Sequence, residues 1–283
     1  MIINRRQWMV GGAALVAELA AGPVMANTTP SKLIGIQLYT VRELFAADPV
    51  ATLKKIAAIG YREVEFGGGG YEKMDHAALR STLERNGLTA PSLHVGYEAL
   101  LTNFGGSVKM AKTLGADTVV VPWVAETQRT AEGWRIALAN FSRWAKQLAQ
   151  VRLGFAYHNH DFEFTTKIGG TSLFDRLIDE TDPALVKLEL DLFWAIAVGE
   201  DPKAIIRRQP GRIYAYHVKD RTLDGKMTSV GNGVIDFADI FSLNRIAGVK
   251  HFFVENDNAP APYLPDITTS FRALSRLHAQ TDL

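Results

Sequence analysis

The stretch Val151-Arg152-Leu153-Gly154-Phe155-Ala156-Tyr157-His158-Asn159-His160-Asp161-Phe162-Glu163-Phe164 joins an apolar run to a polar cluster. The run 151–156 is typical of a buried strand, and two imidazoles and two carboxylates follow where that strand should end. In chains that alternate strands and helices, sites form most often at strand ends. The alternative interpretation is a solvated, histidine-rich loop. The stretch therefore predicts a buried strand that leads into a site.

The same pattern of an apolar run followed by a helical segment repeats along the chain. Helices are expected over residues 50–59, 75–86, 131–150, 171–180, 201–208 and 266–278. The predicted strands end at Leu38, Phe66, Val95, Pro122, His158, Asp191, His217 and Glu255. Their mean spacing of about 31 residues is the size of one strand–helix unit, and eight such units close into a single (β/α)8 TIM barrel.

This barrel is expected to span about Leu33 to Leu277, within one domain over residues 27–283. Its core should contain the apolar side chains of Trp134, Phe141, Phe155 and Leu188. A doubly wound open sheet is the alternative fold. The first strand lacks the glycine-rich phosphate loop that such sheets carry, which counts against this alternative.

The first 26 residues resemble an export signal. Arg5-Arg6 precede a short run of apolar and small residues from Val10 to Ala21, and Val24-Met25-Ala26 is an A-x-A-like cleavage site. An uncleaved membrane anchor is the alternative, but the run is shorter than a membrane span and contains Glu18. We expect cleavage after Ala26, export of the folded protein by the twin-arginine machinery, no stable membrane span afterwards, and a periplasmic or secreted product.

The composition excludes several kinds of site. The formal net charge is +1 and no basic block is present, so nucleic acid is not expected as a partner. Cysteine is absent, which excludes disulfides, thiolate nucleophiles and cysteine-held metals. Any metal must therefore be bound by histidine and carboxylate side chains. The sequence leaves open whether the protein forms a homo-oligomer.

Histidines and carboxylates gather at the predicted strand ends. The candidates are His94, His158, His160, His217, Glu163, Asp191 and Glu255. Imidazoles and carboxylates that converge at a barrel mouth suit a divalent cation such as Mn, Mg, Zn or Co. A ring of structural salt bridges is the alternative.

Several motifs together resemble the sugar phosphate isomerase/epimerase family of xylose isomerase-like barrels. They are Gly35-Ile36-Gln37-Leu38-Tyr39-Thr40-Val41-Arg42, the His158–Phe164 motif, Asp191, His217-Val218-Lys219-Asp220, Gly231-Asn232-Gly233-Val234-Ile235-Asp236-Phe237 and Glu255. The resemblance extends from about Leu33 to the C-terminus. It implies a cation bound by one residue of the fifth strand together with Asp191, His217 and Glu255, and it implies that Glu255 also transfers a proton.

The chain departs from the family pattern at two positions. Many epimerases of the family have Glu at the end of the fifth strand, where this chain has His158, with Glu163 five residues later. Either residue could be the fourth ligand, and the prediction favours Glu163. Trp194 stands where the family often has His, which argues against a two-glutamate epimerase mechanism.

The expected activity is enediolate chemistry on a free sugar or keto-sugar, since a chelated cation makes the proton beside a carbonyl acidic. Isomerisation or epimerisation is the first expectation, and lyase or hydratase action that eliminates from a 3-keto-glycoside or a related keto-sugar is the second. An endonuclease IV-like phosphodiesterase and a non-catalytic sugar-binding barrel are the alternatives of another class. Glu255, His158 and His160 are the candidate acid/base groups. The candidates for holding the sugar are His94, Lys219, Trp194 and Gln37.

Overall fold

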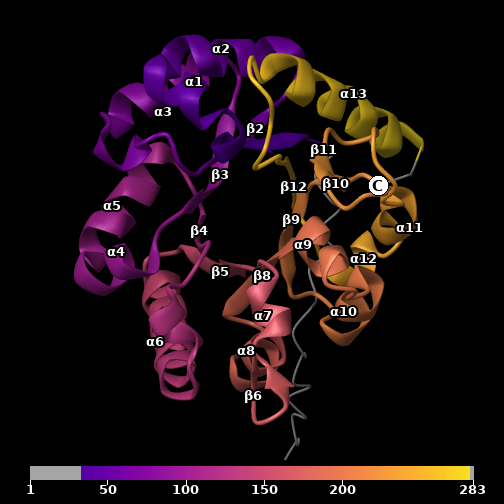
Figure 1. The fold of residues 1–283 in the computed structure, drawn as a ribbon. Coiled ribbons are helices and arrows are strands. Elements are labelled where there is room, and N and C mark those ends of the chain that lie inside the picture. The colour runs from indigo at the N-terminus through magenta and orange to yellow at the C-terminus, as the bar shows by residue number, and fades with distance from the viewer. Residues whose placement is uncertain (1–32, 281–283) are drawn as a thin grey trace, which may run out of the picture.

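The protein is described by a computed structural model that covers residues 33–280, so the predicted signal segment lies outside the described residues. Eight parallel strands close into a barrel with helices on its outside (Figure 1). The barrel strands are β1 (Gly35–Gln37), β2 (Glu63–Phe66), β3 (Thr89–His94), β4 (Thr118–Val121), β5 (Gly154–His158), β8 (Val186–Asp191), β9 (Ile213–Val218) and β12 (His251–Val254). This arrangement confirms the predicted TIM barrel.

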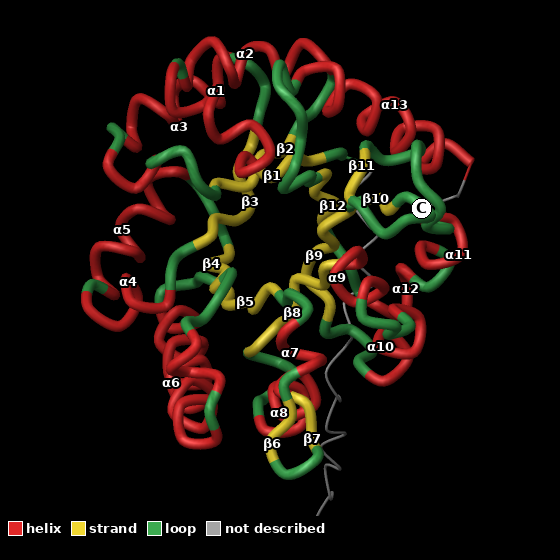
Figure 2. The backbone as a smooth tube through the Cα atoms, in the orientation of Figure 1, coloured by secondary structure: helices red, strands yellow, loops and turns green. Residues whose placement is uncertain are grey.

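The strands pair in the order β1-β12-β9-β8-β5-β4-β3-β2, and the last strand of this order pairs with the first. Figure 2 looks into the ring of strands and shows the helices around it. The helices are α1 (Arg42–Ala47), α2 (Pro49–Ile59), α3 (His76–Arg85), α4 (Tyr97–Thr102), α5 (Phe104–Leu114), α6 (Ala131–Gln150), α7 (Phe162–Thr165), α8 (Leu173–Glu180), α9 (Leu192–Ala197), α10 (Pro202–Arg208), α11 (Phe237–Phe241), α12 (Asn244–Ala247) and α13 (Leu264–Gln280).

Two short hairpins lie outside the barrel sheet. One pairs β6 (Lys167–Ile168) with β7 (Thr171–Ser172), and the other pairs β10 (Asp220–Arg221) with β11 (Met227–Thr228). The predicted helix 171–180 is therefore partly wrong, because its first two residues belong to β7. Within the part of the chain described by the structure, no helix is both long and apolar enough to cross a membrane.

Helix α6 shows how the sequence sets an element and its end. The Thr130 hydroxyl accepts a hydrogen bond from the Gly133 N–H and caps the first turn. The helix stops in a turn over residues 151–153, where Arg152 adopts a positive φ of 63°. The predicted strand 151–156 is thus displaced: strand β5 begins at Gly154 and continues to His158.

The apolar core has two parts. Most of it lies between strands and helices, and the four predicted core residues are all buried in this layer: Trp134, Phe141, Phe155 and Leu188. A separate small cluster contains Val120, Ala156, Tyr214, Ala215 and Phe253. Alternate residues of a barrel strand face the lumen, so the side chains two positions beyond Ala156, Ala215 and Phe253 point to the same interior nearer the carboxyl ends. These next positions are His158, His217 and Glu255.

Candidate active site at the barrel mouth

Four neighbouring strands bring together His158 from β5, Asp191 from β8, His217 from β9 and Glu255 directly after β12. One nitrogen or oxygen atom of each side chain lies within 4.8 Å of the corresponding atoms of the other three. All four side chains are buried. We refer to these four residues as the mouth group.

The strand register explains why the mouth group assembles. Asp191 is paired with His217 across β8 and β9, and Phe253 is paired with His217 across β9 and β12. The Glu255 N–H then continues the ladder by donating to the Val218 carbonyl. Side chains at matching heights on adjacent strands meet in the lumen, which brings sequence-distant residues into contact.

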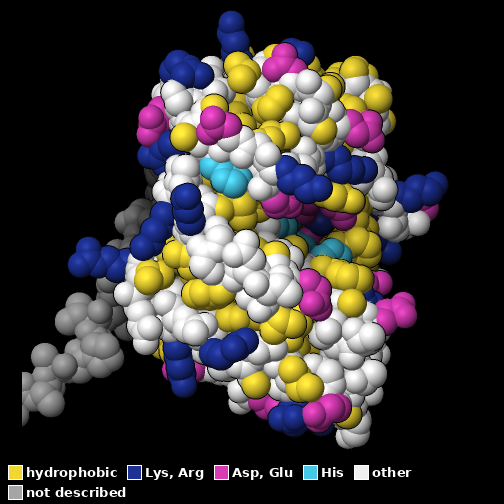
Figure 3. Space-filling view, turned by 90° about the vertical axis from the view of Figure 1, so that its left-hand side faces the viewer, with side chains coloured by type: hydrophobic (Ala, Val, Ile, Leu, Met, Phe, Trp, Pro, Cys, Tyr) yellow, Lys and Arg dark blue, Asp and Glu magenta, His cyan; other side chains and the backbone are white. Residues whose placement is uncertain are grey.

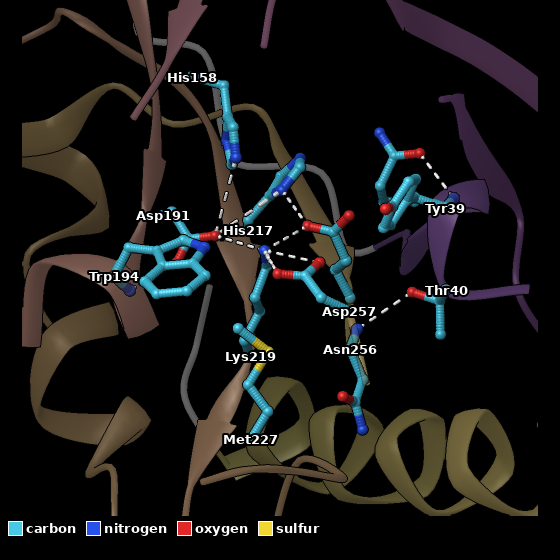
Figure 4. A network of polar contacts seen from close by, with 12 residues as sticks. Tyr39, Thr40, His158, Asp191, Trp194, His217, Lys219, Met227, Asn256 and Asp257 are labelled. Carbon is cyan, nitrogen blue, oxygen red and sulfur yellow. Dashed lines mark hydrogen bonds and ion pairs between the residues drawn. The ribbon is translucent and has the colours of Figure 1, made fainter. Parts of the chain in front are cut away.

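Lys219 binds the acidic side of this group. Its ammonium lies 2.7 Å from Glu255 Oε2, 3.0 Å from Asp191 Oδ2 and 3.0 Å from Asp257 Oδ2 (Figure 4). Burial would lower the pKa of Lys219, but these three carboxylates hold it well above its ordinary value. Lys219 is therefore a fixed positive charge beside the mouth group.

The charges of the mouth carboxylates differ because their surroundings differ. Burial raises the pKa of Asp191 to about 6, against the attraction of Lys219 and His217. Burial would also raise the pKa of Glu255, but the positive charges of Lys219 and His217 hold the pKa of that carboxyl well below its ordinary value. Glu255 is thus ionised at neutral pH and can accept a proton from a bound molecule.

The donor set of the mouth group fits a divalent cation. Two imidazoles and two carboxylates are ligands that Zn, Mn and Co accept. His158 Nδ1 is buried and makes no hydrogen bond within the described chain, and the buried Asp191 Oδ2 has the Lys219 ammonium at 3.0 Å as its charged partner. Burial lowers the pKa of His158 well below its ordinary value, with His217 adding to the effect, so this imidazole is neutral as metal binding requires.

Glu163, the ligand favoured from the sequence, lies outside the mouth group. Its Oε1 accepts a hydrogen bond from the Tyr157 hydroxyl at 2.6 Å, and its Oε2 accepts one from the His160 N–H at 2.8 Å. Burial raises the pKa of Glu163 to about 7, although both hydrogen bonds oppose the rise. Because α7 begins at Phe162 and turns this carboxyl toward Tyr157, the structure replaces Glu163 by His158 as the fifth-strand member of the group.

A second cluster lies beside the mouth group in the lumen, and two of its members, Glu65 and Glu189, were not predicted from the sequence. Glu65 on β2 and Glu189 on β8 are completely buried, and each contacts His94 and His217. Burial would lower the pKa of His94, but Glu65 and Glu189 raise it to about 9. The period-two alternation in Glu63-Val64-Glu65 and Glu189-Leu190-Asp191 is the signal that could have identified both carboxylates as lumen-facing.

Gln37 has a different role from the predicted one. Its amide nitrogen donates to Glu65 Oε2 at 2.8 Å and its carbonyl accepts from the Tyr39 N–H at 3.0 Å. The side chain is completely buried and does not line the cavity above the mouth group. Gln37 therefore supports Glu65, and its buried side chain has no surface on the cavity in which a sugar would bind.

A cavity of about 620 Å³ opens above the mouth group. Its lining includes the predicted residues His94, His158, His160, Trp194, Lys219 and Glu255, together with Tyr39, Trp123 and Asp257, which were not predicted. Burial lowers the pKa of His160 to about 3, with Lys219 contributing, so its imidazole is neutral. In a side view of the molecule, histidine and acidic side chains gather in a recess toward the right of the picture (Figure 3).

Comparison with known proteins agrees with this geometry. Residues 53–266 match the family model for the xylose isomerase-like TIM barrel. The inosose dehydratase of Geobacillus thermodenitrificans is 30% identical over 151 residues, which are 47% of this chain and 50% of the relative. The chain thus spans about half the length of the first curated relatives it matches, although the inosose dehydratase of Geobacillus kaustophilus aligns over 80% of this chain and 84% of its own length at 24% identity.

Solved structures share the fold. A sugar phosphate isomerase/epimerase from Parabacteroides distasonis superposes with a TM-score of 0.73 at 23% identity, covering 85% of this chain and 96% of that chain. The IOLI protein, which has a bound zinc atom, gives 0.70 at 16% identity over 88% and 98% of the two chains. A Mycobacterium smegmatis barrel in complex with magnesium gives 0.66 at 12% identity over 88% and 97%.

Proposed function

The chain belongs to the xylose isomerase-like TIM-barrel family, and from this premise we propose that it eliminates water or an alcohol from a keto-sugar or a keto-polyol. The observation that carries the proposal is the mouth group of His158, Asp191, His217 and Glu255, two of whose members, His158 and Glu255, line a cavity large enough for a sugar. A divalent cation bound there would polarise a carbonyl and stabilise the enediolate formed beside it.

Glu255 is the proposed base. It lies at the cavity floor, it is ionised at neutral pH, and its Oε2 is held by His217 Nδ1 and by the Lys219 ammonium, both at 2.7 Å. In an elimination the carboxylate takes the proton from the carbon beside the carbonyl, and the electron pair of that bond enters the enediolate. The bond from the next carbon to oxygen then breaks, and the same carboxyl can return its proton to the leaving oxygen.

This single-carboxylate route is why elimination is preferred to epimerisation. Epimerisation needs a proton donor on the face of the carbon opposite the base. The fifth-strand position that carries Glu in many epimerases is His158 here, and both His158 and His160 are neutral because burial lowers the pKa of each imidazole. The curated relatives from the two Geobacillus species are inosose dehydratases, and dehydration is an elimination of this kind.

The cavity residues suit a polyhydroxylated substrate. Trp123, Trp194 and Tyr39 supply aromatic faces, and Lys219 and Asp257 supply a donor and an acceptor. Ligand sites of this kind combine apolar contact area with a few placed polar groups. Trp123 is 47% exposed and Tyr39 is 40% exposed, so both have free surface that a bound sugar can cover.

Turnover in deuterated water tests the proposal. Metal-loaded protein is incubated with a panel of keto-sugars, keto-polyols and keto-glycosides, and the products are read by mass spectrometry and NMR. We expect loss of water or of the aglycone. Unreacted substrate should carry deuterium only at the carbon beside the carbonyl, whereas the product has lost the hydrogen of that carbon and takes up deuterium only at the carbon that lost its oxygen, when the enol formed by elimination returns to the ketone. Deuterium incorporation with no loss of mass would replace elimination by isomerisation or epimerisation, and metal-bound protein that turns over none of the panel would favour a binding barrel.

Two variants of the same strand region sharpen the assay. Glu255→Gln keeps the size of the side chain but cannot accept the proton. The rate of hydrogen–deuterium exchange at the carbon beside the carbonyl should therefore fall by roughly 10²-fold or more, which is the contribution of a general base. His251→Gln lies at the opposite end of β12, where His251 contacts Glu63, and should leave exchange nearly unchanged. Near-normal exchange by Glu255→Gln with its metal bound would assign the base to another residue.

A further inference from the structure

Four donor atoms in the lumen alternate between nitrogen and oxygen around one point. They are Glu65 Oε2, His94 Nε2, Glu189 Oε1 and His217 Nε2. His94 Nε2 lies 3.1 Å from the Glu65 oxygen and 2.9 Å from the Glu189 oxygen. His217 Nε2 lies 2.8 Å and 2.9 Å from the same two oxygens. We refer to these four residues as the deep group.

Protons do not satisfy this arrangement. Each imidazole Nε2 carries at most one hydrogen, so the four short nitrogen–oxygen contacts share at most two hydrogens. A cation among the four atoms would contact all of them at once. Tetrahedral zinc bound at about 2.0–2.2 Å holds its ligand atoms roughly 3.3–3.6 Å apart, so shifts of a few tenths of an ångström to about half an ångström would fit these four donors to it.

A second observation points to a cation in the same place. The other carboxylate oxygen of Glu189, Oε2, is completely buried and has no hydrogen-bond partner among the described residues. By contrast, the other oxygen of Glu65 accepts a hydrogen bond from the Ser92 hydroxyl. A buried carboxylate oxygen without a donor is costly, and a cation that engages the Glu189 carboxylate would remove this cost.

The charge balance leads to the same site. His217 faces both groups, with Nδ1 2.7 Å from Glu255 Oε2 and Nε2 toward Glu65 and Glu189. A cation in the mouth group would use Nδ1 and leave this imidazole without positive charge. Only His94 would then offset the two carboxylates of the deep group, whereas a divalent cation there balances both.

We propose that Glu65, His94, Glu189 and His217 form a second divalent-cation site, with His217 shared between the two groups through its two ring nitrogens. When both groups hold a cation, His217 releases its remaining N–H proton to solvent and binds as an imidazolate. Nitrogen and oxygen donors of this kind select a cation such as zinc, manganese or cobalt. The access route passes His94, which lines the cavity and also contributes a ligand atom to the deep group. The inference stands on the donor geometry and does not depend on the proposed elimination.

Counting bound metal tests the inference. Purified protein is loaded with zinc, dialysed against metal-free buffer and measured by elemental mass spectrometry, and apoprotein is titrated with cobalt(II) while its visible spectrum is recorded. Wild type should bind two equivalents. Glu189→Gln should lose the metal ion of the deep group, and Asp191→Asn should lose the metal ion of the mouth group. Each variant should therefore retain one equivalent of metal.

Glu63→Gln is the matched control, because Glu63 also lies on β2, is buried and pairs with a histidine, His251, outside both groups. It should retain two equivalents. If wild type binds one equivalent of metal, and this metal is lost in Asp191→Asn but retained in Glu189→Gln, the deep site is overturned and the proposed function is unaffected. If wild type binds one equivalent of metal, and this metal is lost only in Glu189→Gln, the deep site is supported. The proposed function then no longer has a cation in the mouth group. The wild-type count alone separates one site from two if a variant fails to fold.

Discussion

Replacing Glu163 with glutamine should stabilise the protein above neutral pH and leave its stability unchanged in acid. The carboxyl group is fully buried, and burial raises its pKa from 4.5 to about 7. In the unfolded chain the carboxyl has its ordinary pKa, so between these two values the native protein holds a proton that the unfolded protein has lost. The stability due to this proton is complete below about pH 4.5 and disappears as the pH rises through about 7.

The size of the effect follows from that interval. The free energy of unfolding changes by about 1.4 kcal/mol per pH unit for one proton, so an interval from 4.5 to about 7 corresponds to about 3.5 kcal/mol. Glutamine avoids this loss because it has no charge. Its carbonyl can accept from the His160 N–H, and its NH2 can donate to the Tyr157 hydroxyl, which accepts as well as donates. The free energy of unfolding of Glu163→Gln should therefore exceed that of wild type by about 3.5 kcal/mol near pH 8 and equal it near pH 4.

Urea unfolding of both proteins at several pH values, with a chelator present, gives the comparison. The difference between wild type and variant isolates Glu163, since all other titrating groups are common to both. Glu98→Gln, at an exposed position, is the control and should show no pH-dependent difference. Because Glu163 lies outside the mouth group, the variant should also bind as much metal as wild type. Equal stabilities near pH 8, or lost metal in the variant, would refute the reasoning.

Three further predictions concern other parts of the chain. Arg212→Ala should destabilise the protein by about 3–5 kcal/mol in urea unfolding, because it leaves buried acceptors without their donor; a loss below about 1 kcal/mol would contradict this. The acceptors are the carbonyls of Leu177, Ile178 and Val186, Thr181 Oγ1 and Gln209 Oε1. Chelation should lower the melting temperature, and metal at about a hundredfold over its Kd should restore about 2.7 kcal/mol; an unchanged melting temperature would argue against a bound cation. Exported protein should have the intact mass of a chain that begins at Asn27, and a retained Met1–Ala26 segment in a membrane fraction would exclude cleavage.

The sequence by itself determined the barrel and the position of the polar cluster at its mouth. Strands and helices alternate at a near-constant spacing, and polar side chains follow the apolar strands, as at His158, Asp191 and Glu255. These features are local, because hydrophobic periodicity and helix-ending residues act over a few positions. A parallel barrel then places every strand end at the same mouth, which is why the mouth residues could be named before their contacts were known.

The choice among neighbouring residues was decided by tertiary structure. His158 and Glu163 are five positions apart and the sequence favoured Glu163, but the chain turns into α7 between them and the Glu163 carboxyl meets Tyr157 and His160. In the sequence, Glu65 and Glu189 are indistinguishable from ordinary strand residues. They join the deep group only because β2 and β8 face each other across the closed barrel. Their neighbours His94 and His217 come from other strands, at distances set by strand register and barrel closure. Local sequence fixes neither the strand register nor the closure of the barrel, because both depend on how the whole ring of strands packs.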